Sequence, residues 1–368
     1  MDHPQEGKIS AGKGMTIMDL REILEEAVRA PSGDNCQPWR FEVTGDTVRI
    51  IDLPGRDTSL FNHRQRASLV AHGALLENLA IVASTRGYTI DVTLFPDVSE
   101  PELVATVLFR PGAIQANPLH DAVKVRCTNR RRYDGSPLTD VERRAIASAC
   151  EGYDGRLILT GNDDEKAFLA GIAALNDRLV FENENLHSFL FDHIRWSDDE
   201  ARQTRDGLDI KTLDLAPPDA LAFPLLKRWP LVRFLNSFGI SRIVAGNARK
   251  LALSSSALGL ILIPGAGAAD YVNAGRILER IWLEAARIGL SVQLTTGITF
   301  LMQKVLEGDT SGLTAPHIEL ISEARRKIAA RFGVTSETIA IMFRIGKSLP
   351  PGARSLRIPV AELITIEQ

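Results

Sequence analysis

The stretch Gly73-Ala-Leu-Leu76-Glu77-Asn-Leu-Ala-Ile-Val-Ala83-Ser-Thr-Arg-Gly87 recurs 202 residues later as Gly275-Arg-Ile-Leu278-Glu279-Arg-Ile-Trp-Leu-Glu-Ala285-Ala-Arg-Ile-Gly289. Glycine, leucine, glutamate, alanine and glycine stand at identical offsets in the two copies. Apolar residues spaced three and four apart, followed by a glycine, predict a helix that ends at that glycine. Strand-like sequence follows both copies, at 89–95 and 291–295. Two amphipathic helices can match by chance, but the shared following element favours an internal duplication.

The duplication predicts a first half at residues 16–120 and a second half at residues 121–368. A helix-like stretch at 141–150 matches the one at 20–28, as expected of two related halves. Residues 1–15, rich in Gly, Lys and Pro, predict a mobile tail. Residues 180–245 are rich in aromatic and charged residues and predict a helical insertion. This insertion could cover a ligand as a lid, or it could decorate the surface; the sequence leaves both interpretations open.

The bulk composition excludes several classes of function. A net charge of −3, with 24% charged and 45% hydrophobic residues, is ordinary for a soluble globular protein and implies no broad attraction to nucleic acid or to membranes. Three cysteines without a Cys-x-x-Cys pair predict no disulfide framework, and seven histidines without metal-ligand spacing predict no metal site. No signal-peptide pattern is seen, and the apolar run at 257–263 is too short to span a bilayer. A cytoplasmic location is therefore expected.

A second informative stretch is Ala30-Pro31-Ser32-Gly33-Asp34-Asn35-Cys36-Gln37-Pro38-Trp39, between a helix-like and a strand-like run. Its prolines, glycine and short polar residues stop a helix and favour a rigid loop. The loop offers backbone N–H groups, a hydroxyl and a carboxamide, which suit a planar polar ligand. Composition alone also fits an ordinary connection between a helix and a strand.

The pattern Ala-Pro-Ser-x-x-Asn-x-Gln-Pro-Trp resembles the signature of the FMN-dependent nitroreductase family, and the ending Gly289-Leu290 resembles that of the family's central helix. The resemblance implies an α+β, nitroreductase-like fold. In the tandem, Acg-type arrangement, two α/β halves form a pseudo-dimer within one chain. Each half has a central, mainly antiparallel sheet flanked by helices. It also implies that Pro31, Ser32, Gly33 and Asn35 contact FMN.

Four arginines crowd the stretch Arg126-Cys127-Thr128-Asn129-Arg130-Arg131-Arg132. Guanidinium groups bind phosphate oxygens through paired hydrogen bonds, and a hydroxyl adds a further donor. A solvated basic turn would have the same composition. The stretch resembles the family's Arg-x-Ser/Thr-x-Arg motif, which implies that Arg126, Thr128 and Arg130 hold the FMN phosphate or the flavin edge.

Two further segments match the family by resemblance. The C-terminal segment that contains Arg354 and Arg357 is similar to the family's basic closing segment over the phosphate, although a basic surface turn would look alike. Thr296 and Gly297 follow the second copy of the repeat, where family members turn backbone N–H groups toward flavin N5. The Glu that many members carry before this glycine is absent here.

The halves are not equivalent. The Pro-Ser loop occurs only in the first half, and its counterpart at 149–155 lacks the Pro-Ser and Asn residues. The arginine cluster occurs only in the second half. We therefore expect one FMN per chain, at the interface of the pseudo-dimer, in a monomer that could associate further.

The resemblance implies an FMN-binding oxidoreductase that transfers hydride or electrons through flavin N5. Its partner would be a small conjugated molecule, such as a nitroaromatic or a quinone, or the substrate of a specialised dehydrogenation, with NAD(P)H as a candidate donor. No protein side chain is expected to be catalytic, because the flavin carries the chemistry. The alternative is a non-catalytic protein that binds and sequesters FMN under a lid. A purely structural protein would require both half-sites to be coincidental.

Overall fold

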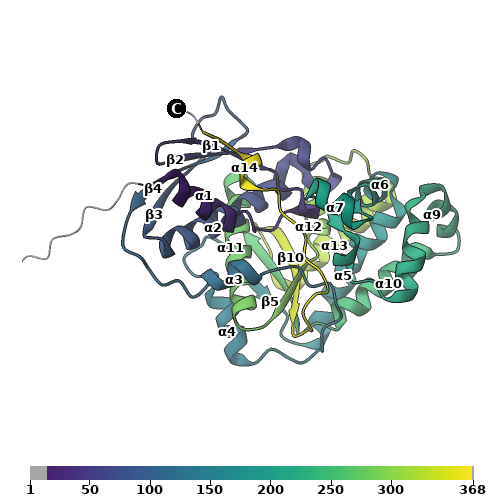
Figure 1. Ribbon diagram of the computed structural model, residues 1–368. Coiled ribbons are helices and arrows are strands. Elements are labelled where there is room, and N and C mark those ends of the chain that lie inside the picture. The colour runs from purple at the N-terminus through teal and green to yellow at the C-terminus, as the bar shows by residue number, and fades with distance from the viewer. Residues whose placement is uncertain (1–14, 367–368) are drawn as a thin grey trace, which may run out of the picture.

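The computed structural model describes residues 15–366, so the tail expected at 1–15 lies, apart from Met15, outside the described residues. The structure has two main sheets, one toward the edge of the molecule and one nearer its middle (Figure 1). The first has the order β11-β1-β2-β4-β3, with strands Ile364–Ile366, Trp39–Thr44, Thr47–Asp52, Leu103–Pro111 and Tyr88–Leu94. The second has the order β5-β8-β10-β9, with strands Arg156–Leu159, Ala257–Ile263, Thr338–Gly346 and Ser291–Leu294.

All strand pairs within these two sheets are antiparallel except β1 with β11. The expected fold class, two related halves with mainly antiparallel sheets flanked by helices, is confirmed. The helices of the two halves are α1 (Ile17–Ala27), α2 (Arg66–Thr85), α3 (His120–Val125), α4 (Asp140–Ser148), α5 (Asp163–Glu182), α11 (Ala268–Arg287), α12 (Gly297–Leu306), α13 (Ala315–Phe332) and α14 (Val360–Leu363).

The two copies of the repeat form α2 and α11, which pack against each other at the centre of the molecule. Their first glycines meet at the crossing point. A Cβ atom on Gly73 would lie 1.9 Å from the carbonyl oxygen of Val272, and one on Gly275 would lie 2.0 Å from that of Val70. No side chain fits at either position, so glycine allows the two helix backbones to approach closely. The sequence repeat is thus also the contact between the halves.

The helices that open the two halves begin in the same way. Thr16 caps α1 and Thr139 caps α4, and each forms a reciprocal capping box with an acidic residue three positions later, Asp19 and Glu142. Such boxes satisfy N–H groups that the first helical turn leaves unpaired. This shared beginning agrees with the match expected between 20–28 and 141–150.

The last strand departs from the simple two-half division. Strand β11 pairs in parallel with β1, with Phe41 opposite Ile364, so residues near the C-terminus extend the sheet of the first half. We retain the division at 120/121 as a proposal, with α14 and β11 crossing back over it.

The insertion is helical, as expected, and lies at one end of the molecule (Figure 1). It comprises α6 (Glu184–His193), α7 (Asp198–Thr204), α8 (Pro217–Ala222), α9 (Trp229–Asn236), α10 (Ile240–Leu253) and the short strands β6 (Ile194–Arg195) and β7 (Leu208–Asp209). Its interior is an aromatic cluster in which His187 stacks on Phe191 at 4.4 Å and Phe191 on Phe223 at 5.1 Å. Phe191 belongs to the same hydrophobic cluster as Leu258 and Leu260 of β8, so the insertion packs onto the core of the second half.

One helical segment, 60–85, is long and apolar enough to cross a bilayer, but 83% of its most apolar window is buried inside the protein. Burial of this kind is expected of α2 as the central helix of a core, since a core helix and a membrane span share the same composition.

Candidate functional site

A cavity of about 130 Å³ lies where the Pro-Ser loop, the arginine turn after α3, the C-terminal segment and the insertion meet. Most of the site residues expected from the sequence line it, although they come from segments more than 200 residues apart. These are Pro31, Ser32, Asn35, Arg126, Thr128, Arg130, Arg354 and Arg357. Their assignment to a cofactor stays a prediction, but their convergence in one cavity is a property of the fold.

The Pro-Ser loop adopts an unusual backbone. Asp34, Asn35 and Gln37 all have positive φ angles, of 43°, 58° and 51°, a conformation that non-glycine residues seldom adopt. The fully buried Gln37 side chain stabilises it by donating to the carbonyl oxygens of Asn35 (3.2 Å) and Arg205 (2.9 Å) and accepting from Ile358 N–H (2.9 Å). One carboxamide thus joins the loop to the insertion and to the C-terminal segment.

Arg126 lies deep between the halves. Its Nε lies 3.1 Å from Oε1 of Glu279 on α11, and its guanidinium stacks over the ring of Trp282 at 4.6 Å. An Nη atom donates to the carbonyl oxygen of Arg29 at 2.5 Å. Burial, against the partial compensation of Arg126, raises the pKa of Glu279 to about 7.

The C-terminal arginines tie their segment to the rest of the site. Arg357 donates to Asn35 Oδ1 at 2.7 Å and to the carbonyl oxygens of Val28 and Ala30 at 3.1 and 3.2 Å. Burial and the nearby Arg126 lower its pKa to about 9. Arg354 donates to the carbonyl oxygens of Lys124 and Val125 at the end of α3. Several cations, of which Arg126 is buried, are thus held close together, an arrangement that a bound anion would stabilise.

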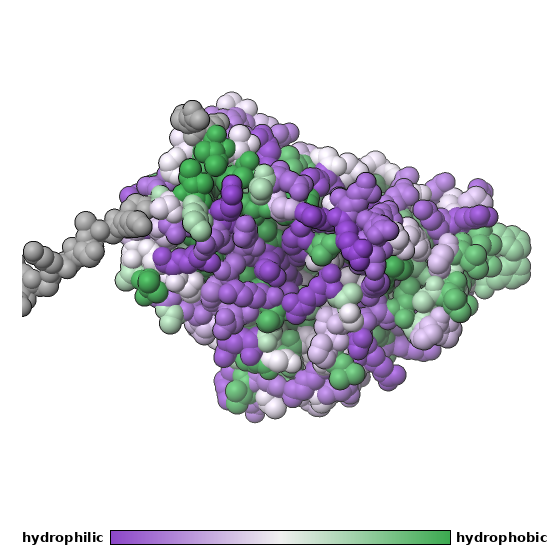
Figure 2. Space-filling view, viewed as in Figure 1, coloured by the Kyte–Doolittle hydropathy of each residue, from purple (hydrophilic) through white to green (hydrophobic). Residues whose placement is uncertain are grey.

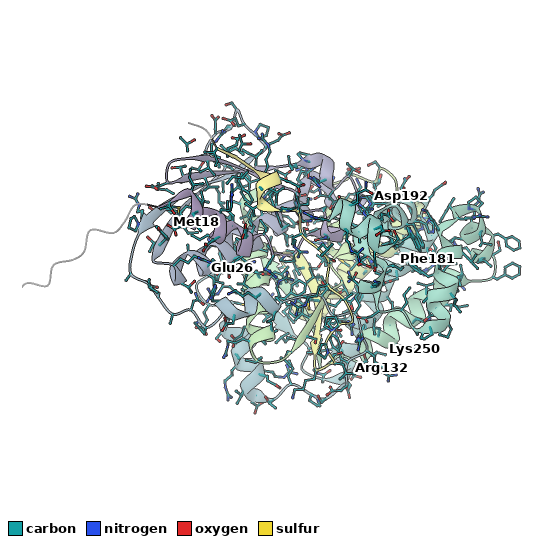
Figure 3. The ribbon with its side chains drawn as sticks, viewed as in Figure 1. Met18, Glu26, Arg132, Phe181, Asp192 and Lys250 are labelled. Atoms are coloured by element: carbon teal, nitrogen blue, oxygen red, sulfur yellow. The ribbon has the colours of Figure 1, made fainter. Side chains whose placement is uncertain are left out.

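Only one of the three consecutive arginines after Asn129 lines the cavity. Arg130 does so, and donates to the carbonyl oxygen of Thr212 in the insertion at 3.1 Å. Arg131 pairs instead with Asp214, with Nε 3.1 Å from Oδ1, and Arg132 is exposed at the surface (Figure 3). The single acidic residue in the lining is Asp34. Burial and the neighbouring Asp57 raise its pKa.

The arginine turn is held from behind by Arg344 of β10, which is 1% exposed. Its guanidinium stacks on the ring of Tyr133 at 3.9 Å and donates to the carbonyl oxygen of Arg131 at 2.7 Å. Asn129 Nδ2 donates to the carbonyl oxygen of Leu349 at 2.8 Å. These contacts fix the direction in which Arg126, Thr128 and Arg130 project.

Three expected residues lie outside the cavity lining. A Cβ on Gly33 would lie 3.2 Å from Asp57 Oδ2, and Thr296 Oγ1 donates to the carbonyl oxygen of Met342 at 3.1 Å. Gly297 begins α12, and a Cβ there would lie 2.2 Å from Asn176 Oδ1 and 2.8 Å from the Phe61 ring. The space at Gly297 is therefore filled by side chains, and the structure does not join this segment to the cavity.

The sequence reasoning missed some lining residues. Four of them lie in the chain close to an expected residue, which was the one sign in the sequence that they could line the site: Arg29, Asp34, Lys124 and Cys127. Leu208 and Thr212 come from the insertion, and no local pattern marks them. Among residues 15–366, no group of three or more His, Cys, Asp or Glu side chains is placed to hold a metal ion.

The position related by the repeat has a different structure. Glu77, the counterpart of Glu279, accepts from Arg276 Nε at 3.1 Å, Arg280 Nη1 at 3.0 Å and the hydroxyl of Tyr153 at 2.7 Å. Tyr153 belongs to the loop at 149–155, the counterpart of the Pro-Ser loop. Its ring lies under both arginines, at 5.4 and 5.6 Å.

No family model matches the chain. An uncharacterised protein of Mycobacterium tuberculosis (strain CDC 1551 / Oshkosh) is 29% identical over 278 residues, which are 74% of this chain and 38% of that much longer relative. The chain thus spans well under half the length of this relative. The M. tuberculosis protein Acg, named as a candidate NAD(P)H nitroreductase, is 25% identical over 289 residues, which are 77% of this chain and 81% of Acg.

The chain is thus similar to proteins named as nitroreductases. The match to Acg runs through most of both chains, as the tandem arrangement requires. Among solved structures, the FMN-dependent nitroreductase NfnB from Mycobacterium smegmatis, in complex with NADPH, aligns with 68% of this chain and 98% of its own. The identity is 12% and the TM-score is 0.38.

Proposed function

We propose that the chain is an FMN-binding oxidoreductase with one flavin site, in which the cavity described above holds the phosphate end of FMN. The observation that carries the proposal is the convergence of the Pro-Ser loop with five arginines in one cavity whose lining contains a single carboxylate. Guanidinium groups around a recess with little negative charge are suited to a phosphate.

The size of the cavity supports this partial assignment. At about 130 Å³ it is smaller than the roughly 300–1,000 Å³ of pockets that enclose a whole drug-sized ligand. The donor set therefore fits the phosphate, and the described conformation encloses no space for the whole flavin ring. The roles of Thr296 and Gly297 at flavin N5 remain proposals that would require Asn176 and Phe61 to move.

In this proposal each group has a distinct task. Arg130 and Thr128 provide donors to the phosphate, and Arg126 provides positive charge from the floor of the site. Asn35 and Arg357 hold the loop and the C-terminal segment together. When bound, FMN would supply hydride and electron transfer. The substrate class we propose is a small conjugated nitroaromatic or quinone, with NAD(P)H as donor, on the basis of the relationship to Acg.

The test is a titration of the apoprotein with FMN and, in parallel, with riboflavin, which lacks the phosphate. We expect one FMN per chain. The double variant Thr128→Ala/Arg130→Gln should bind FMN at least about tenfold more weakly while its affinity for riboflavin is unchanged. Arg132→Gln, on the same turn but outside the cavity, is the matched control. Two flavins per chain, or unchanged FMN affinity in the double variant, would contradict the assignment.

A second candidate, an FMN-sequestering protein without turnover, is favoured by the closure of the site. Leu208 and Thr212 of the insertion line the cavity, and Gln37 and Arg130 are hydrogen bonded to insertion carbonyl groups. Anaerobic mixing of the flavin-loaded protein with NADH or NADPH separates the candidates. Bleaching of the flavin, followed by reoxidation with a nitroaromatic or a quinone, indicates an enzyme. A flavin that neither donor reduces, and that once reduced reacts with neither acceptor, indicates sequestration.

A further inference from the structure

The insertion ends in an exposed apolar surface, which we call the insertion tip, formed by α8, α9, α10 and the turns between them. Its exposed apolar side chains are Leu221, Leu225, Phe234, Phe238 and Ile243. Phe234 and Phe238 are 61% and 72% exposed, and among residues 15–366 every other Phe, Tyr and Trp side chain is buried or half-buried. Figure 2 shows hydrophobic residues gathered at the end of the molecule where α9 and α10 lie.

The two phenyl rings are held outward by a rigid base. They contact each other at 5.3 Å, on either side of the end of α9. Below them, Val232 is fully buried, Asn236 Nδ2 donates to the carbonyl oxygen of Phe181 at 2.6 Å, and Ser241 Oγ donates to Glu182 Oε1 at 2.8 Å. The helical hairpin formed by α9 and α10 is therefore anchored to α5, and its exposed rings are a fixed feature of the surface.

Charge is segregated around this surface. From residue 220 to residue 269 the chain contains no Asp or Glu, and Asp219, exposed on α8, lies directly before this stretch. The same fifty residues contain six basic side chains, all exposed, and none of the six forms an ion pair within the described part of the chain: Lys227, Arg228, Arg233, Arg242, Arg249 and Lys250. Figure 3 shows the Lys250 side chain below α10, toward Arg132, so the basic side chains nearest the exposed rings are those of the earlier part of this stretch. The net charge of −3 is an average that does not reveal this local excess.

We propose that the insertion tip docks onto the surface of an anionic lipid bilayer. Aromatic and aliphatic side chains projecting from a short amphipathic hairpin enter the interface between headgroups and acyl chains, and surrounding Lys and Arg bind the anionic headgroups. Long basic side chains can lie along the bilayer surface while their charges stay in water. This peripheral contact is independent of the proposed flavin chemistry.

A second copy of the chain is a less suitable occupant. A symmetric pair built on the insertion tip would bring the cations near it, Lys227, Arg228, Arg233 and Arg242, close to those of the other copy, with Asp219 as the one carboxylate on α8, α9 or α10. Like charges so placed repel, whereas an anionic lipid surface complements them.

The test is flotation of the full chain with vesicles of phosphatidylcholine alone or of phosphatidylcholine containing 30–50% phosphatidylglycerol, roughly the range in which surface charge is substantial. We expect binding only to the anionic vesicles, and loss of binding when the salt concentration is raised. Phe234→Ala/Phe238→Ala and Arg233→Glu/Arg242→Glu should each weaken partitioning by about tenfold or more.

The matched controls change exposed residues elsewhere. Val98→Ala/Ile114→Ala removes two exposed apolar side chains, and Arg21→Glu/Arg144→Glu reverses two exposed charges; neither should change partitioning. Circular dichroism melting verifies that each variant is folded. Absence of binding to anionic vesicles overturns the proposal, as does equal binding by the tip variants and their controls. A concentration-dependent dimer that Phe234→Ala/Phe238→Ala dissociates, without vesicle binding, would instead identify a contact between copies.

Discussion

Glu77 and Glu279 occupy equivalent positions in the two copies of the repeat, yet their surroundings differ. Glu77 is 1% exposed and has three close partners, two arginines and a tyrosine hydroxyl. Glu279 is fully buried, with Arg126 as its nearest cation, and its pKa is raised to about 7. The carboxylate of Glu77 is surrounded by side chains of the protein itself. The cation beside Glu279, Arg126, also lines the cavity.

The difference agrees with the proposal of one flavin site per chain. Tyr153, Arg276 and Arg280 convert the Glu77 position into a structural contact between the halves. The Glu279 position keeps Arg126, Arg357 and the Pro-Ser loop around a recess. Both positions depend on the close approach of α2 and α11 at Gly73 and Gly275.

Gly275→Ala should have the largest effect. Its Cβ would lie 2.0 Å from the carbonyl oxygen of Val70, and both helices would have to move apart. We expect the free energy of unfolding to fall by more than about 3 kcal/mol in chemical denaturation. Gly171→Ala, on α5 with open space around it, is the control and should be neutral or stabilising by up to about 1 kcal/mol. Equal effects of the two substitutions would refute close helix contact.

Glu77→Gln should lower the unfolding free energy by about 2–4 kcal/mol, because it leaves Arg276 and Arg280 without their carboxylate in a partly buried position. Glu284→Gln, which removes a surface pair between residues three apart on the same helix, should change it by no more than about 0.5 kcal/mol. If the two variants are equally stable, Glu77 does not hold the halves together.

Glu279→Gln should alter the pH dependence of stability. The raised pKa means that between about pH 4.5 and 7 the folded state retains a proton that the unfolded state has released. Stability of the wild type should therefore fall as pH rises through this window, by about 3 kcal/mol from this group. The variant should lack that loss, as measured by chemical denaturation at pH 4.5 and pH 8. Parallel curves for the two proteins would show that Glu279 has an ordinary pKa.

The smallest effect expected is on flavin affinity. Arg126→Gln alone would leave Glu279 without its cation, so the informative variant is Arg126→Gln/Glu279→Gln, which we expect to weaken FMN binding by about tenfold. Arg276→Gln/Glu77→Gln removes a pair with the same 3.1 Å separation at the equivalent position. Its FMN affinity per folded chain should be unchanged. Equal losses in both would mean that the two positions do not differ in function.

The fold could be predicted from the sequence because each copy of the repeat is recognisable within a stretch of fifteen residues. Gly73 and Gly275 each lie within a clear helical pattern of apolar residues. Both glycines are needed for the close contact between α2 and α11. Most of the candidate site was accessible through short motifs, the Pro-Ser loop and the arginine turn. Leu208 and Thr212 were not, because their contribution depends on how the insertion folds back. Nor could the sequence separate Gly297 from the cavity, since Phe61 and Asn176 reach it from distant segments.

The parallel pairing of β1 with β11 has a consequence for biosynthesis. Phe41 and its partner Ile364 are 323 residues apart, so the sheet of the first half lacks an edge strand until residue 364 has left the ribosome. At about 5–20 residues per second, that interval is on the order of 15–60 s. Throughout it, one side of β1 presents unpaired N–H and C=O groups, which are the usual template for aggregation. We expect a nascent chain stalled before Ile364 to bind chaperones more strongly than the released protein.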